Sequence, residues 1–242
     1  MTLNISPAKR KPPVVVDKKK AGTTWLVWAA ALGLLGFLVF LFVVLSFRRE
    51  PNFYTTAMAL EKSVSEVAGD EFERRSLDFV NKTKRIGKWS ATFSAEHFNG
   101  WLATDFLQKF PKSLPPTIAD PRIDLQAEEI SLALRWSWFG MGGVAVMRAD
   151  VYCTSRVGEI AIQFKGARTG VLSLPIKSIG DAIAGGLSQN GFSTRWTDNG
   201  GDPVLTVVPP LSFRQYDRAR ISIKSIDVKE SEVVITGETT IE

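Results

Sequence analysis

The sequence predicts an α+β domain with a largely antiparallel sheet, preceded by a single N-terminal transmembrane helix. The run from Trp25 to Phe47 contains no charged residue, no Pro and no Asn or Gln. About 20 apolar residues suffice for a helix to cross the hydrocarbon core. Beyond residue 120, several segments alternate apolar and polar side chains, which is the pattern of strands. Apolar residues at helical spacing recur between the strands, and this mixture favours the α+β class.

Residues 1–24 are predicted to form a disordered cytoplasmic tail. They contain six basic residues and one acidic residue, with three prolines among the lysines, a composition that does not bury a core. The side of a span that carries the excess of Lys and Arg lies in the cytoplasm. Arg48 and Arg49 on the other side weaken this bias without reversing it. Residues 48–242 are therefore expected across the membrane.

Residues 25–47 are predicted to be the transmembrane helix, in the form of an uncleaved signal anchor. A cleaved signal peptide has an apolar region of roughly 7–15 residues that ends at a small-residue site. This run is longer and ends Leu45-Ser46-Phe47-Arg48-Arg49. A buried core helix is the other alternative, but the run is apolar on all sides and has no polar face to turn to water.

The charge of the chain gives no indication of nucleic-acid binding. The formal net charge is +5, of which the tail carries +5 and Arg48 and Arg49 a further +2, so residues 50–242 carry −2. A basic tail beside a span indicates topology and contact with anionic lipid. The single cysteine, Cys153, excludes an intrachain disulfide. The extracytoplasmic part must therefore be held together by its core, for which about 190 residues are ample.

Residues 48–87 are predicted to form a juxtamembrane amphipathic helical segment. Apolar residues recur there at helical spacing, and Gly69-Asp70 is expected to interrupt the pattern. The segment is therefore one interrupted helix or two helices. The apolar positions are Phe53, Ala57, Leu60, Val64, Val67 and Ala68 before the interruption, and Phe72, Phe79 and Val80 after it.

Residues 88–242 are predicted to form the extracytoplasmic α+β domain. A short strand is expected around Trp89–Phe93, and Ser94 is expected to cap a helix that ends at Pro111. A second helix is expected after Pro175 and is stopped by Asn190-Gly191. The remaining segments alternate with period two and are separated by turns. The expected strands include 123–125, 130–138, 144–154, 160–164, a hairpin around 198–202, and a closing pair at 221–228 and 233–240.

No catalytic constellation is recognisable in the sequence. His97 is the only histidine, and no nucleophile signature such as G-x-S-x-G accompanies it, so a structural role is favoured. With one His and one Cys, zinc clusters of thiolate and imidazole are excluded. The glycines of Gly140–Gly143 follow a strand and precede another strand, so neither a dinucleotide fingerprint nor a phosphate loop fits. We therefore expect no enzyme activity, no metal and no cofactor.

Apolar side chains are the remaining candidates for a binding surface. The simplest interpretation is that they form an ordinary core. The alternative is that the sheet and the helices fail to close, which leaves an apolar groove for acyl chains. Periodicity alone does not separate the two. The candidate groove residues are Phe98, Trp101, Leu102, Trp136, Trp138, Ile160, Ile162 and Phe164.

Three segments of the domain resemble a group of bacterial envelope proteins. Residues 93–102, FSAEHFNGWL, resemble the motif that opens the extracytoplasmic domain of YpmS-like proteins, which has a hydroxyl residue, a Glu-aliphatic-Asn run and a Leu. Ser94, Asn99 and Leu102 match, whereas His97 and Phe98 replace the expected Glu and Ile. Residues 170–175, GVLSLP, followed by a helix, are also similar to this group. The ending over 221–237 is similar to it and to LmeA-like lipid-binding proteins.

This resemblance, over about residues 90–240, implies a TULIP-like architecture, a curved antiparallel sheet wrapped around one or two helices. Members bind phospholipid or other acyl chains in the groove, without catalytic residues. The implied location is the inner (plasma) membrane, with the domain in the periplasm. The leading hypothesis is a single-pass protein that binds or handles membrane lipid. The alternative is a non-catalytic scaffold with an envelope protein partner, bound through a sheet edge, the 53–85 helix or span packing at Ala29 and Gly33.

Overall fold

The computed structural model describes residues 21–47, 49–111, 114–138, 141–156, 158–189, 191–208 and 219–241. Its contacts divide the chain into two units, Met1–Phe42 and Val43–Glu242, which we describe separately. Most of the predicted tail, residues 1–20, lies outside the described residues. The segment over 48–87 packs within the same compact unit as residues 88–242.

The helix α1 spans Ala21–Phe47 and contains the whole apolar run. It begins before Trp25, the first residue of the predicted span. Side chains from residue 31 to residue 42 are exposed. Among the described residues, no single helix meets the length and hydropathy needed to cross a membrane. Ala31–Phe47 and Asn52–Met58, bent by 48° at the break between them, meet these requirements as a pair, by length and composition only.

Two helices follow, but the interruption lies earlier than the sequence predicts. The helix α2 spans Asn52–Met58, and α3 runs without a break through Lys62–Thr83, so the predicted interruption at Gly69-Asp70 is wrong. Gly69 instead lies where α3 crosses the next helix. A Cβ on Gly100 would come within 2.6 Å of the Gly69 backbone nitrogen and of the Ala68 Cβ. Glycine here allows close helix packing, which sequence spacing alone does not distinguish from a helix break.

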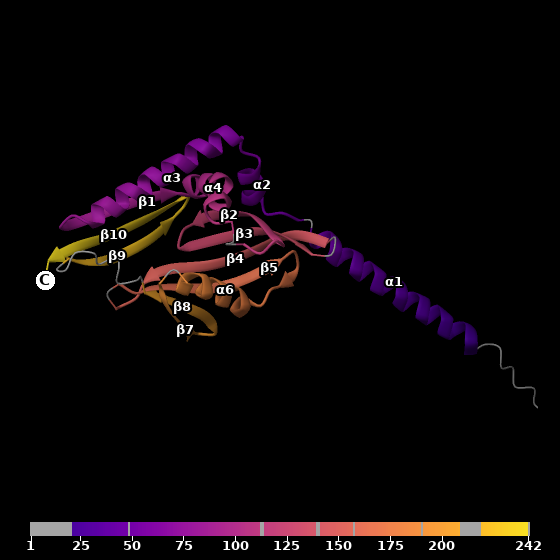
Figure 1. Ribbon diagram of the computed structural model, residues 1–242. Coiled ribbons are helices and arrows are strands. Elements are labelled where there is room, and N and C mark those ends of the chain that lie inside the picture. Colours follow the sequence, from indigo (N-terminus) through magenta and orange to yellow (C-terminus); the bar gives the residue numbers. More distant parts are fainter. Residues whose placement is uncertain are drawn as a thin grey trace, which may run out of the picture. The chain divides into compact units, whose positions relative to one another are not determined.

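The rest of the compact unit is an α+β arrangement with a large antiparallel sheet, as predicted. The described residues form two sheets, one of three strands in the order β1-β10-β9 and one of seven strands, in which β2-β3-β4-β5-β8-β7 are neighbours and β6 pairs with β5 (Figure 1). All the strand pairs formed by the described residues are antiparallel. The strands are β1 (Gly87–Ser94), β2 (Ile118–Gln126), β3 (Glu129–Trp138), β4 (Met141–Cys153), β5 (Ile160–Thr169), β6 (Leu172–Ser173), β7 (Ser193–Asn199), β8 (Asp202–Val208), β9 (Ala219–Lys229) and β10 (Glu232–Ile241).

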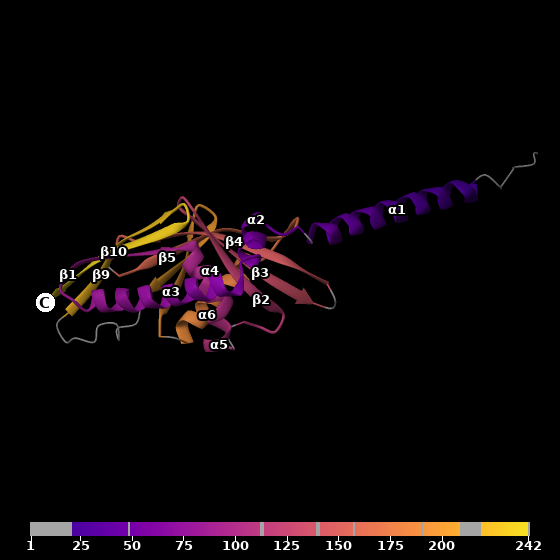
Figure 2. The same ribbon diagram turned by 90° about the horizontal axis from the view of Figure 1, so that it is seen from above.

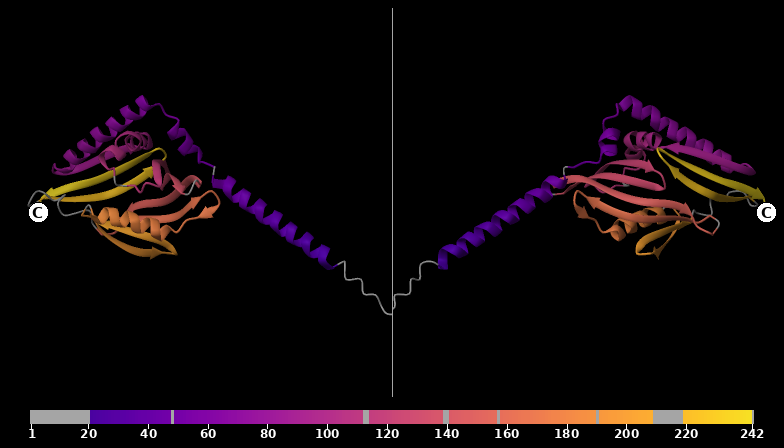
Figure 3. Two further views of the ribbon diagram at one scale, coloured as in Figure 1. Left: turned by 45° about the vertical axis from the view of Figure 1, so that its right-hand side comes forward. Right: turned by 180° about the vertical axis from the view of Figure 1, so that it is seen from behind.

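Three further helices follow: α4 (Ala95–Thr104), α5 (Phe106–Lys109) and α6 (Ile176–Gln189). The α4 helix packs on β2, and α6 packs on β5, β7 and β8. The α3 helix runs alongside β1 in all views (Figures 2 and 3). The Asn99 side chain of α4 binds both the backbone N–H and the C=O of Ile123, each at 2.8 Å. Because these groups belong to β2, the outermost strand of the large sheet, α4 protects an edge that would otherwise be free to pair with another chain.

The two sheets meet at their hairpin turns. The Glu128 N–H donates to the Val228 carbonyl and the Ser231 N–H to the Leu125 carbonyl, both at 2.9 Å. Leu125 and Val228 are buried there with Phe93 and Val233. Phe72 and Phe98 pack on this cluster from α3 and α4. The small sheet and its two helices therefore form one core, distinct from the core under α6.

Candidate functional site

One face of the large sheet is apolar across five neighbouring strands. Paired residues of antiparallel strands point to the same face, and the register aligns rows of apolar side chains across β3, β4, β5, β8 and β7. We call this surface the inner face. Its rows are Leu132, Met147 and Ala167; Ile130, Ala149 and Phe164; Val151, Ile162, Leu205 and Trp196; and Cys153, Ile160 and Val207.

The opposite face of the same strands is polar over much of its area. Arg148 lies within 3.8 Å of Glu129, and Lys165 within 3.1 Å of Asp150. Tyr152, next to Val151 on β4, is also exposed on this side. Apart from Ala133, Val144 and Val146, which pack with Tyr54 of α2 on this opposite face, the alternation of β3 and β4 sorts apolar and charged side chains onto opposite faces.

The α6 helix packs on the inner face with a single apolar stripe. Ile176, Ile179, Ile183 and Leu187 contact the buried cluster around Phe164 and Leu205. At Gly180 the helix lies against the Trp196 ring, since a Cβ there would come within 2.3 Å of a ring carbon. The Trp196 indole N–H donates to Asp181 at 2.9 Å. Glycine at position 180 thus allows the helix and strand β7 to approach closely.

The inner face is only partly closed by α6. Phe164 and Leu205 are 1% and 0% exposed. Met147, Ala149, Ala167 and Val207 are buried as well. By contrast, other apolar side chains of this face retain intermediate exposure, and so does the apolar stripe of α6 itself. Exposed apolar area costs about 25 cal/mol per Å² relative to burial, so a further apolar ligand would gain free energy here. The partly exposed set is Leu132, Leu134, Trp136, Val151, Ile160, Ile162, Ile176, Ile179, Ile183, Leu187 and Phe192.

The end of the inner face near Trp136 contacts Ser46 and Phe47, which belong to the compact unit. The Phe47 ring meets the Trp136 ring edge to face, with centroids 5.6 Å apart, and the Trp136 indole N–H donates to the Thr169 hydroxyl at 2.8 Å. Two glycines make room for this contact. A Cβ on Gly143 would lie 2.6 Å from the Phe47 carbonyl oxygen, and one on Gly170 would lie 2.7 Å from the Ser46 backbone.

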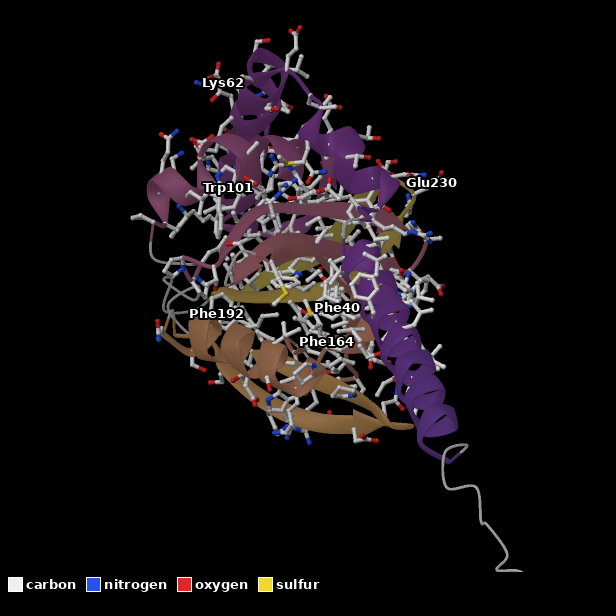
Figure 4. The ribbon with its side chains drawn as sticks, turned by 90° about the vertical axis from the view of Figure 1, so that its right-hand side faces the viewer. Phe40, Lys62, Trp101, Phe164, Phe192 and Glu230 are labelled. Atoms are coloured by element: carbon white, nitrogen blue, oxygen red, sulfur yellow. The ribbon has the colours of Figure 1, made fainter. Side chains whose placement is uncertain are left out.

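The structure does not bring all the predicted groove residues together. Ile162 and Phe164 lie in the cluster beneath α6, and Ile160 neighbours Val207 on the same face. Trp136 lies on this face at its Phe47 end. Phe98, Trp101 and Leu102 are on α4, where Phe98 and Trp101 pack on Phe72 of α3. Figure 4 shows Trp101 and Phe164 in different layers. Trp138 ends β3, and its side chain lies outside the described residues.

The apolar stripe of α6 was not predicted to be part of the site, although its spacing is visible in the sequence. Ile176, Ile179, Ile183 and Leu187 repeat at three- and four-residue intervals, which identifies a buried face but not its partner. Phe47 was also missed, because it was assigned to the span. The pairing of α6 with the inner face depends on contacts that are distant in sequence.

No group of three potential metal ligands occurs among the described residues. Cys153 is half-buried, and burial followed by the charge of Asp227 raises the pKa of its thiol. A raised pKa keeps the thiol protonated and makes it a poor nucleophile. Nothing in the described part of the chain therefore favours covalent chemistry at this cysteine.

His97 has a structural task at the start of α4. The Ser94 hydroxyl accepts from the His97 N–H at 3.2 Å, and the His97 Nδ1 accepts from the Ser94 N–H at 3.3 Å. This reciprocal pair is a capping box with His in place of the usual Glu or Gln. Ser94 therefore caps this helix as the sequence predicts, and the box requires a neutral imidazole, because protonated Nδ1 has no lone pair to accept a hydrogen bond.

Acidification is expected to weaken this cap. Burial, and then the charge of Arg75, lowers the pKa of His97 below its ordinary value of 6.5, while Glu71 and Glu96 oppose this. A lowered pKa in the folded state means that the stabilisation is present above 6.5 and is lost as the pH falls through the folded value. Loss of one cap costs about 1 kcal/mol.

The measurement is the free energy of unfolding between about pH 7 and pH 5, the range in which histidine titrates. His97→Gln keeps a capping-box acceptor that does not titrate in that range. The difference in the free energy of unfolding between the wild-type chain and this variant should therefore change by about 1 kcal/mol over this pH range. A difference that stays constant with pH would show that the imidazole does not serve as the cap acceptor.

No protein-family model, no curated protein and no solved structure matches the chain. The resemblance to YpmS-like and LmeA-like proteins therefore stays a prediction.

Proposed function

We propose that this chain is a single-pass membrane protein whose extracytoplasmic domain binds lipid acyl chains on the inner face beside α6. The observation that carries the proposal is the incomplete burial of that face. Leu132, Val151 and Ile162 remain partly exposed on a face that α6 covers with a single stripe. Each methylene moved from water to such a surface contributes about 0.8 kcal/mol, and lipid chains supply many methylenes.

The membrane anchor in this proposal is the apolar run Trp25–Phe47. Its support is the absence of charge along the run, its helical conformation in α1, and the basic tail before it, which favours a cytoplasmic N-terminus. The domain would then lie on the periplasmic side of an inner membrane. A TULIP-like arrangement fits this role, since the antiparallel sheet presents one apolar face to a helix. No catalytic step is part of the proposal.

Photo-crosslinking tests lipid binding in the full chain. The protein is placed in vesicles that contain phosphatidylcholine with a diazirine on one acyl chain, and the irradiated peptides are mapped by mass spectrometry. We expect lipid adducts on peptides from β5 and α6 as well as from α1. Adducts confined to Ala21–Phe47 would mean that the domain does not take up acyl chains.

A matched pair of variants localises the binding. Val151→Glu places a carboxylate on the inner face, where it would have to lose water beside an acyl chain, so adducts on β5 and α6 should fall several-fold. Tyr152→Glu places the same group on the opposite, solvated face of β4 and should leave them unchanged. Circular dichroism melts of both variants establish that they fold. Equal adduct yields in the two variants would argue against the inner face as the site.

The scaffold function has one observation in its favour. Val64 and Val67 on α3 are 42% and 71% exposed, and they border a hollow of about 660 Å³ that Glu71, Glu96 and His97 also line. Exposed apolar residues on a helix are typical of a partner-binding surface. If lipid adducts are confined to α1, Val67→Asp in a co-purification experiment becomes the next test.

A further inference from the structure

The compact unit has a cluster of exposed apolar side chains at one end of its large sheet. Met141 begins β4, and Val171 and Leu172 follow β5. They are 44%, 54% and 45% exposed. The register places both segments at the same end, because Thr169 pairs with Ala145 and with Leu172 (Figure 1). We call Met141, Val171 and Leu172 the apolar tip. Exposed apolar groups of this kind mark an interaction surface.

The backbone at the tip touches the last residues of the apolar run. Gly143, two residues from Met141, lies against Phe47, and Gly170, next to Val171, lies against Ser46. A strand advances about 3.3 Å per residue, so Met141 and Val171 are within about 7 Å of these contacts. The last residues of the apolar run, Ser46 and Phe47, and the apolar tip therefore lie at the same end of the compact unit. This placement does not depend on the direction of α1.

We infer that the apolar tip inserts into the headgroup layer of the bilayer that holds the anchor; this rests on the proposed function. If the run crosses the membrane, Phe47 marks the edge of the hydrocarbon core. The headgroup layer extends about 5–7 Å beyond that edge, which matches the distance from Phe47 to the tip. Arg49 and Arg168, both exposed, flank the tip, and basic residues beside an apolar surface favour anionic headgroups.

Insertion of the apolar tip would give an acyl chain a route from the bilayer to the inner face. Trp136 and Thr169 lie at the tip end of that face, whereas Cys153, twelve residues along β4 from Met141, lies about 40 Å away. An acyl chain that left the bilayer at the tip would meet apolar side chains at once. The inner face would therefore fill from the membrane, without passage of the chain through water.

Site-specific fluorescence quenching tests this in the full chain. Cys153→Ala removes the natural thiol, and single cysteines at Met141, Val171 and Leu172 carry an environment-sensitive fluorophore. The protein is reconstituted into vesicles of phosphatidylcholine and phosphatidylglycerol. Leu77→Cys on α3 is the matched control, because Leu77 is 67% exposed and lies away from the tip. Leu38→Cys in α1 reports on the anchor, and a melting curve of each labelled chain establishes folding.

We expect quenching by nitroxide-bearing lipids at the three tip positions to exceed that at Leu77 several-fold, and quenching by aqueous iodide to be correspondingly lower. If the tip labels behave like Leu77 while the Leu38 label is quenched by lipid, the tip does not insert, although the anchor stands. If the Leu38 label is itself open to iodide, the anchor proposal fails and this inference fails with it.

Discussion

Replacing Phe164 with alanine is expected to lower the free energy of unfolding by about 3–5 kcal/mol, the range for truncation of a buried aromatic residue. Phe164 is 1% exposed, and its ring centroid lies 5.7 Å from that of Trp196. It also lies beneath Gly180 of α6, within 3.4 Å of where a Cβ would stand. The substitution therefore removes one of the main contacts among the sheet, α6 and β7. Denaturant titration of the full chain in detergent measures the loss.

Tyr152→Ala is the control for this prediction. Tyr152 lies on the opposite face of β4 and is 37% exposed, so its truncation should change the stability by no more than about 0.5 kcal/mol. A loss of under about 1 kcal/mol for Phe164→Ala would mean that α6 is not packed on the sheet as the structure has it.

The same variant also bears on the proposed function. Truncation at position 164 leaves an apolar cavity beside the partly exposed inner face, and such cavities accept apolar ligands. Any ligand that binds the folded state adds to its stability. A short-chain phospholipid should therefore recover part of the loss in Phe164→Ala, and it should raise the stability of the wild-type chain less. No recovery would argue against access of acyl chains to this face.

Local elements of this fold could be predicted because their signals are local. The alternation of Ile130–Trp138 predicted strand β3, and the spacing of Ile176–Leu187 predicted α6. Ser94 predicted the start of α4. In each case the side-chain period or the cap is a property of neighbouring residues. The antiparallel sheet followed from short turns between strands, and the structure confirms it.

The assembly of these elements could not be predicted in the same way. Gly69 was interpreted as a helix break, because the spacing does not reveal that Gly100 lies against it. Phe98 and Ile162 were placed in one groove, since both belong to apolar faces, yet they belong to separate cores. A period identifies which side of an element is buried, and only contacts distant in sequence decide what buries it. The division into two sheets depends on such contacts at Glu128 and Ser231.

The segment after the apolar run is held to the domain at several points, and this affects any mechanism that uses the membrane. Ser46 is buried, Tyr54 of α2 is fully buried with Ala133 and Val144, and Glu50 lies 3.2 Å from Arg135. Burial raises the pKa of the Tyr54 hydroxyl, as expected for a group enclosed in the core. Residues 46–47 and 49–58 therefore form a packed joint, which would hold the end of the inner face at a fixed distance from the end of the run.

Opening this joint is expected to have the second large effect, and Gly170→Ala is the variant that opens it. Gly170 has a φ of +55°, which costs a residue with a Cβ about 1 kcal/mol. The new methyl group would also stand 2.7 Å from the backbone of Ser46. Because that neighbour is backbone and cannot rotate away, residues 44–47 must move off the sheet. Cleavage by trypsin at Arg48 and Arg49 should then become about tenfold faster, since proteolysis follows local opening.

Gly200→Ala separates the two causes. Gly200 has a φ of +65° in the turn between β7 and β8, and a Cβ there would meet nothing within 4 Å. This variant has the backbone strain without the steric clash. Its free energy of unfolding should therefore fall by a similar amount because of the strain. The rate of cleavage at Arg48 and Arg49 should stay unchanged. Equal cleavage rates in both variants would mean that Ser46 is not docked on Gly170. Faster cleavage in Gly170→Ala alone, with lower lipid quenching at Val171, would show that the docked joint holds the apolar tip in the membrane.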